Sequence, residues 1–150
     1  MTTVEMIKVY INHLCTEIGV TPESVYSEEF KSWSFSRGAS CIEVFFTSYE
    51  TSSKTVRIFI RCFSAIYPLP PEAQKQLDLY RVAMESNVHY MGVKMGTIPN
   101  KAFLYAVAER DIEGMDYDEF VTLISDLGYW AERLSGELRT KLGVPQTNLN

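Results

Sequence analysis

Apolar residues recur at steps of three and four at the start of the chain, which is the pattern of an amphipathic helix. The pattern predicts a helix over residues 3–18. Thr2 and Glu5 have the spacing of a capping box, in which each side chain bonds the backbone of the other. Gly19 follows the last apolar position and is the expected C-terminal stop.

Two further helices are predicted later in the chain. One follows Pro71 over residues 72–86 and is ended by Asn87, a residue that tolerates the left-handed conformation. Its narrow apolar stripe is formed by Ala73, Leu77, Tyr80 and Met84. The other starts at a second capping box, Asp116 with Glu119, and runs to about Leu142. Its apolar positions step by four and three, so it is expected to cover a core.

Stretches rich in β-branched and aromatic residues predict strands. Five stretches have this character: residues 31–36, 39–49, 54–66, 88–95 and 102–108. We expect the second and third to pair as a hairpin with Val44 opposite Ile60 and Glu43 opposite Arg61. This register gives one continuous apolar face and places opposite charges side by side on the other.

The resulting order is α-β-β-β-α-β-β-α, and an antiparallel sheet covered by helices is the simplest way to bury the apolar faces. The predicted class is therefore α+β. With 150 residues and no linker or repeat, residues 1–143 are expected to form one domain and residues 144–150 a disordered tail.

Composition narrows the function classes. The formal net charge of -5, with the 14 basic residues scattered, disfavours binding to a nucleic acid. We expect no membrane association, because no apolar run approaches the length of a span, and a cytoplasmic protein, because the start has no secretory pattern. Cys15, Cys41 and Cys62 fit neither a disulfide framework nor a metal motif, so reduced thiols are expected.

Catalytic, metal and cofactor motifs are not recognised in the sequence. His13 and His89 have no partner at a metal-ligand spacing, and no glycine-rich phosphate loop occurs. Six carboxylates lie within residues 109–119, but they lack the order of a calcium loop. Acids at a helix entrance are the better explanation. We therefore expect a protein that is not an enzyme and holds no cofactor.

The second face of the predicted sheet is unusually aromatic. Phe45, Phe59 and Phe63 fall on the face opposite the core, and we assign Trp33 and Phe35 to the same partner-binding surface. Exposed aromatic patches on small domains mark contact surfaces. The competing interpretation is that the last helix, through Tyr129 and Trp130, covers these side chains, and the sequence leaves both open.

Two other functions stay open as alternatives. A small-ligand-binding or enzymatic domain could use a cleft between the last helix and the sheet, with Tyr105, Glu109 or His89 as its polar groups. Arg57 and Arg61 among the phenylalanines could instead form a platform for single-stranded nucleic acid, although the net charge opposes this.

The pattern resembles the type III secretion chaperone-like fold, which includes the secretion chaperones and the YbjN-like proteins. The resemblance extends from Val4 to Leu142. It is carried mainly by Leu79-Tyr80 and Asn87 on the middle helix, the strands 88–94 and 103–107, the acidic approach 116–120 and Tyr129-Trp130-Ala131 on the last helix. Tyr80 departs from the family pattern, where a second aliphatic residue is usual.

The resemblance implies a non-catalytic binding module. Secretion chaperones hold an extended segment of a client protein along their sheet and helix surfaces, and strand addition at a sheet edge is a coherent route. YbjN-like proteins are associated with regulation. Chaperones of this fold are often dimers through the middle helix, so a homodimer is a further expectation.

Overall fold

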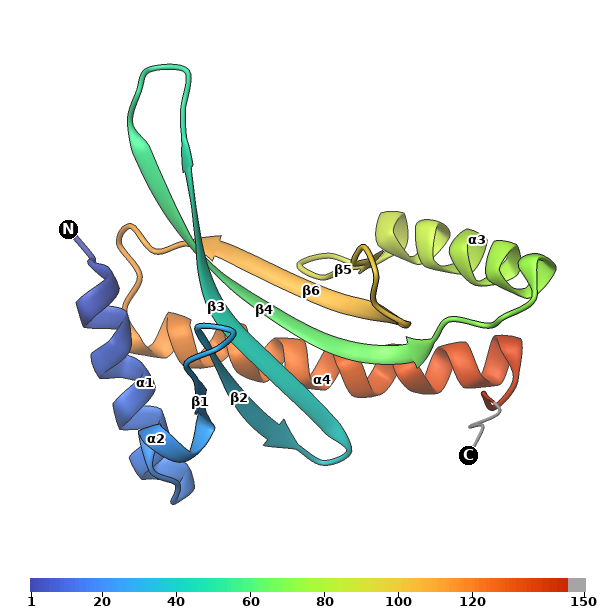
Figure 1. Cartoon of the computed structure of the whole chain (residues 1–150), viewed down its shortest axis with the longest axis horizontal. Helices are drawn as coiled ribbons and strands as arrows, with labels where there is room; N and C mark the ends of the chain where they lie inside the picture. The colour runs from blue at the N-terminus through green and yellow to red at the C-terminus, as the bar shows by residue number, and fades with distance from the viewer. Residues whose placement is uncertain (146–150) are drawn as a thin grey trace.

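The computed structural model describes residues 1–145 and shows an antiparallel sheet with helices packed against it (Figure 1). The helices are α1 (Val4–Ile18), α2 (Pro22–Val25), α3 (Ala73–His89) and α4 (Tyr117–Leu142). The strands are β1 (Tyr26–Ser27), β2 (Ser32–Arg37), β3 (Ser40–Glu50), β4 (Val56–Pro68), β5 (Lys94–Thr97) and β6 (Phe103–Asp111), in the sheet order β1-β2-β3-β4-β6-β5. The α+β class and antiparallel architecture are confirmed. The short α2 and β1 were not predicted, because segments of this length show no hydrophobic periodicity in the sequence.

The long helix α4 covers one face of the sheet, which we call the inner face; the opposite face is the outer face. Alternate strand residues fill the inner face, and α4 packs its apolar stripe onto them. The buried residues of this contact include Ile42, Val44, Ile60, Ala106 and Ala108 from the strands and Ile124, Leu127, Ala131 and Leu134 from α4.

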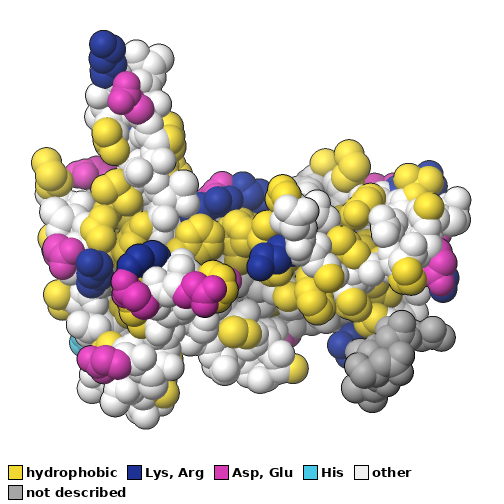
Figure 2. Space-filling view, in the orientation of Figure 1, with side chains coloured by type: hydrophobic (Ala, Val, Ile, Leu, Met, Phe, Trp, Pro, Cys, Tyr) yellow, Lys and Arg dark blue, Asp and Glu magenta, His cyan; other side chains and the backbone are white. Residues whose placement is uncertain are grey.

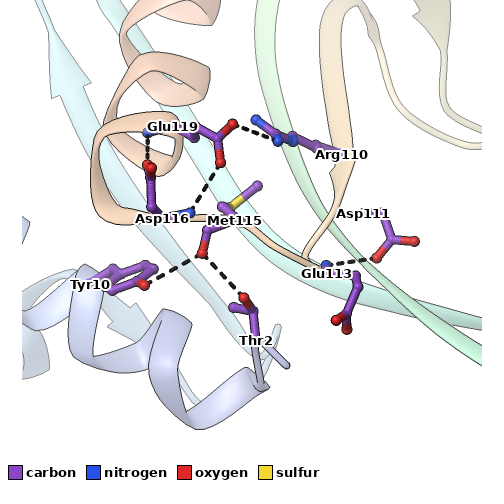
Figure 3. Close-up of polar contacts among 8 residues, drawn as sticks. All are labelled: Thr2, Tyr10, Arg110, Asp111, Glu113, Met115, Asp116 and Glu119. Atoms are coloured by element: carbon purple, nitrogen blue, oxygen red, sulfur yellow. Dashed lines mark hydrogen bonds and ion pairs between the residues drawn. The ribbon is translucent and has the colours of Figure 1, made fainter.

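The helix entrance at residues 110–119 ties α1 to α4 (Figure 3). Asp116 accepts from the Glu119 amide at 2.8 Å and the Glu119 carboxylate accepts from the Asp116 amide at 3.1 Å, which confirms the predicted capping box. The Thr2 and Tyr10 hydroxyls both donate to the Met115 carbonyl. The predicted cap of α1 was wrong by one residue, because buried Thr2 makes this tertiary bond while Thr3 caps the helix.

The register of the β3–β4 hairpin differs from the predicted one by two residues. Val44 pairs with Cys62, and Phe45 rather than Glu43 lies opposite Arg61. The difference arises at the turn, where the Thr51 amide donates to the Thr55 carbonyl and Lys54, just before Thr55, has φ 60°. Because the shift is even, every side chain keeps the face that the pattern predicts.

Beyond Val44 in β3 and before Phe59 in β4, the two strands pair only with each other. This part of the hairpin, which we call the ribbon, projects from the sheet (Figure 1).

The middle helix α3 buries the face opposite to the predicted stripe. Its buried residues are Leu79, Ala83 and Ser86, whereas Leu77 and Met84 are exposed. Small side chains allow close packing, so this face contacts β5 and α4 although it is only weakly apolar. The helix also continues through Asn87 to His89, and the predicted strand 88–95 is replaced by a shorter β5.

Of the predicted tail 144–150, residues 146–150 lie outside the described part of the chain. Within residues 1–145, no helix is both long and apolar enough to cross a membrane. The three thiols are free in the structure, and Cys41 is exposed whereas Cys15 and Cys62 are buried.

Candidate functional site

The outer face carries three of the predicted aromatic residues. Phe45 of β3 and Phe59 and Phe63 of β4 are half-buried there, on the side away from α4. The alternative in which the last helix covers them is therefore wrong. Figure 2 shows this face, where hydrophobic side chains gather between the ribbon and β5 with charged side chains among them.

Trp33 and Phe35 do not belong to this face. They pair with Val44 and Ile42, so they share the inner face, and both are buried in the core. Their assignment to the partner-binding surface was wrong, because the pairing of β2 with β3 fixes their side, and Ser34 between them is exposed on the other face.

Two tyrosines complete the aromatic surface and were not predicted as part of it. Tyr105 of β6 packs on Phe63 with ring centroids 6.2 Å apart, and Tyr49 of the ribbon packs on Phe59 at 5.5 Å. Phe45 and Phe63 meet edge to face at 5.1 Å. Tyr49 could have been predicted on this face from its even spacing from Phe45 along the same strand. Predicting Tyr105 would have required knowing that β4 pairs with β6.

Charged residues cross the outer face in two rows. The Arg61 Nε lies 2.8 Å from one Glu109 oxygen, and the Lys94 Nζ lies 2.5 Å from the other, so Glu109 joins three strands. Arg57 pairs with Asp111 in the second row. These arginines also cover the rings, since the Arg61 guanidinium carbon is 4.8 Å from the Phe63 centroid and that of Arg57 is 5.4 Å from Phe59.

The ion pairs hold both carboxylates in the charged form. Hydrogen bonds from Lys94 and then Arg61 lower the pKa of Glu109. The Glu113 amide, together with Arg57, lowers the pKa of Asp111. Carboxylates with lowered pKa values are weak bases at neutral pH, so this arrangement favours binding over general base catalysis.

Stability should fall at acid pH through Glu109. A carboxylate whose folded pKa is depressed stabilises the fold above its unfolded pKa, and that contribution disappears as the pH falls through the folded pKa. We expect Glu109→Gln to be less stable than wild type at pH 7 and to lose less stability between pH 7 and about pH 3. Urea unfolding across this range measures the difference. Glu29→Gln, in an exposed turn, is the control; an equal pH response of wild type and Glu109→Gln would contradict the assignment.

A hollow of about 330 Å³ opens at the β5 side of the outer face. Its walls include Arg61, Phe63 and Lys94, and the β5–β6 turn closes it with Ile98 and Pro99. The hollow therefore has an apolar floor and a cationic rim, with room for a side chain or a short segment.

The polar groups of the predicted cleft do not come together between α4 and the sheet. Tyr105 and Glu109 lie on the outer face, and His89 is exposed at the end of α3. The acidic run is divided between two places. Asp116 and Glu119 act at the helix entrance, where Arg110 pairs with Glu119 at 2.8 Å, and Glu109 and Asp111 form the ion pairs of the outer face. Among residues 1–145, no group of three or more His, Cys, Asp or Glu side chains is placed to hold a metal ion.

Sequence comparison finds no matching family model and no matching curated protein. Solved structures do match. The ExsC–ExsE complex aligns over 91% of this chain and 96% of its own with TM-score 0.65 and 11% identity. The Yersinia pestis type III secretion chaperone SycH, in complex with a fragment of YscM2, aligns over 84% and 97% with TM-score 0.52 and 12% identity.

YbjN from E. coli aligns over 95% of this chain and 96% of its own, with TM-score 0.58 and 10% identity. At such identities the likeness concerns the fold alone. The chain has the type III secretion chaperone-like fold.

Proposed function

We propose that this chain is a cytoplasmic, non-catalytic protein-binding module that holds a segment of a partner protein on the outer face of its sheet. The observation that carries the proposal is the row of half-buried aromatic side chains, Phe45, Phe59 and Phe63, on the face that α4 leaves open. Rings of this kind supply large contact area at low entropic cost.

Two further observations support this function. The rings are surrounded by ion pairs that are already formed, so a partner finds an ordered apolar surface with a polar rim. Two of the structures with the same fold are complexes, ExsC–ExsE and SycH with a fragment of YscM2, and the latter is a secretion chaperone. By extension from these structures, we propose a chaperone-like or regulatory role for this chain.

Changing Phe45 and Phe63 together to serine should remove partner binding. Affinity purification from the source cell with the wild-type chain and with the variant, followed by mass spectrometry, compares the proteins recovered. We expect at least a roughly tenfold loss of a specific partner, since two anchors at about 1–2 kcal/mol each contribute. Phe30→Ser changes an exposed ring in the β1–β2 turn and is the matched control. Equal recovery of every partner by the double variant, with its fold intact, would refute the proposal.

We also propose that two copies pair through α3. Leu77, Met84 and Val88 are 50%, 71% and 90% exposed on one side of this helix, opposite its buried side. In an antiparallel crossing near Met84, Arg81 of one copy would lie close to Glu85 of the other. The exposed stripe thus combines apolar side chains with opposite charges that can meet across a two-fold axis.

A further inference from the structure

The strand β5 is the last strand of the sheet, and its outer side has no neighbouring strand. An edge strand presents unpaired N–H and C=O groups to which another chain can add a strand. Natural proteins therefore protect such edges. At β5, a side chain of α3 hydrogen-bonds the edge directly.

Asn87 bonds the backbone of Met95 in both directions. Its Nδ2 donates to the Met95 carbonyl at 2.9 Å, and its Oδ1 accepts from the Met95 amide at 2.6 Å. A carboxamide that gives and receives one bond at the same residue copies what a residue of a neighbouring strand would do. Asn87 therefore occupies the pairing position of a strand that is not there.

The backbone groups of β5 point alternately to β6 and to the edge, which defines how many residues are left to pair with another strand. Because both polar groups of Met95 point to Asn87, those of Lys94 and Gly96 point to their β6 partners, Val107 and Tyr105. Thr97, two residues after Met95, is then the other residue of β5 that faces the edge. One side chain thus closes one of two outward pairing positions in a strand of four residues.

We propose that Asn87 is an edge guard that keeps β5 closed to strand addition by a second copy of this chain. A second copy is the relevant competitor because two β5 edges can pair antiparallel about a two-fold axis. An exposed apolar residue lies in the short connection between α3 and β5, since Met91 is 88% exposed. Its side chain is available to a second copy that adds a strand at this edge.

Replacing Asn87 with leucine tests the guard. Leucine has a similar volume and no polar group, so Met95 loses both bonds while the helix is kept. We expect the Met95 amide to exchange with solvent roughly tenfold faster or more. We also expect sedimentation velocity to show association that grows with protein concentration. Making the change in a Met84→Glu background separates this association from pairing through α3.

Two more variants distinguish a guard from a structural tie between α3 and β5. Asn87→Asp loses the bond to the Met95 carbonyl but leaves a charge at the edge, so it should be destabilised without associating. Thr97→Pro, added to Asn87→Leu, removes an outward N–H and should abolish the association. The proposal is overturned if Asn87→Leu lowers the unfolding midpoint yet sediments as its parent does, or if Thr97→Pro leaves its association unchanged.

Discussion

Phe120→Ala is expected to lower the free energy of unfolding by about 3–5 kcal/mol. Phe120 is fully buried at the first turn of α4, where its ring lies 6.0 Å from that of Tyr10 and 6.3 Å from that of Tyr117. Truncation leaves a cavity at the point where α1 meets α4 and the sheet. Since domains of this size are stable by only about 5–15 kcal/mol, the loss is a large part of the total.

Urea unfolding followed by circular dichroism measures this change. Phe30→Ala is the matched control, because that ring is 63% exposed and its removal should change the stability by less than about 0.5 kcal/mol. If the two variants lost similar stability, the contact between α1 and α4 would not contribute to the core in the way that the structure indicates.

Met84→Glu combined with Val88→Glu is expected to convert a dimer into monomers. If these residues lie at the centre of the proposed α3 interface, each change costs about 2 kcal/mol or more, and the pair raises the dissociation constant of the dimer about a thousandfold. Because both side chains point to solvent in the single chain, the fold should stay intact. Sedimentation equilibrium of wild type and variant gives the two constants.

The matched control changes an exposed apolar residue on another helix. Val9 on α1 is 64% exposed in wild type, and Val9→Glu adds a negative charge outside α3. It should leave the dimer unchanged. A monomeric wild type, or an equal effect of Val9→Glu, would remove the α3 interface while leaving the outer-face proposal untouched.

The two ends of α4 could be predicted well because they depend on local chemistry, whereas the cap of α1 was wrong by one residue and α3 continues past Asn87. The capping box of Asp116 with Glu119 and the end at Leu142 both involve residues a few positions apart. Which face of a helix is buried depends on its neighbours, and here prediction was wrong for α3. Leu77 and Met84 are the more apolar residues, but the smaller Ala83 and Ser86 allow the close packing that the fold uses.

The aromatic surface could be predicted only as far as strand alternation reaches. Phe45, Phe59 and Phe63 were placed on the correct side because a register shift of two residues preserves their face. Trp33 and Phe35 were not, since nothing local to β2 says how it pairs with β3. The ion pairs of Glu109 with Lys94 and Arg61 join residues from three strands, so they could not be predicted without knowledge of the strand order.

The ribbon is expected to open more easily than the centre of the sheet. Its strands have one neighbour each, so its tip can open while the paired centre stays intact, and its amides are expected to exchange with solvent faster than those of the centre. Tyr49 lies in the ribbon and Phe59 at its base, within the proposed binding surface. A partner that binds these rings would therefore bind the closed ribbon and not the open one. Its binding free energy would stabilise the ribbon against local opening.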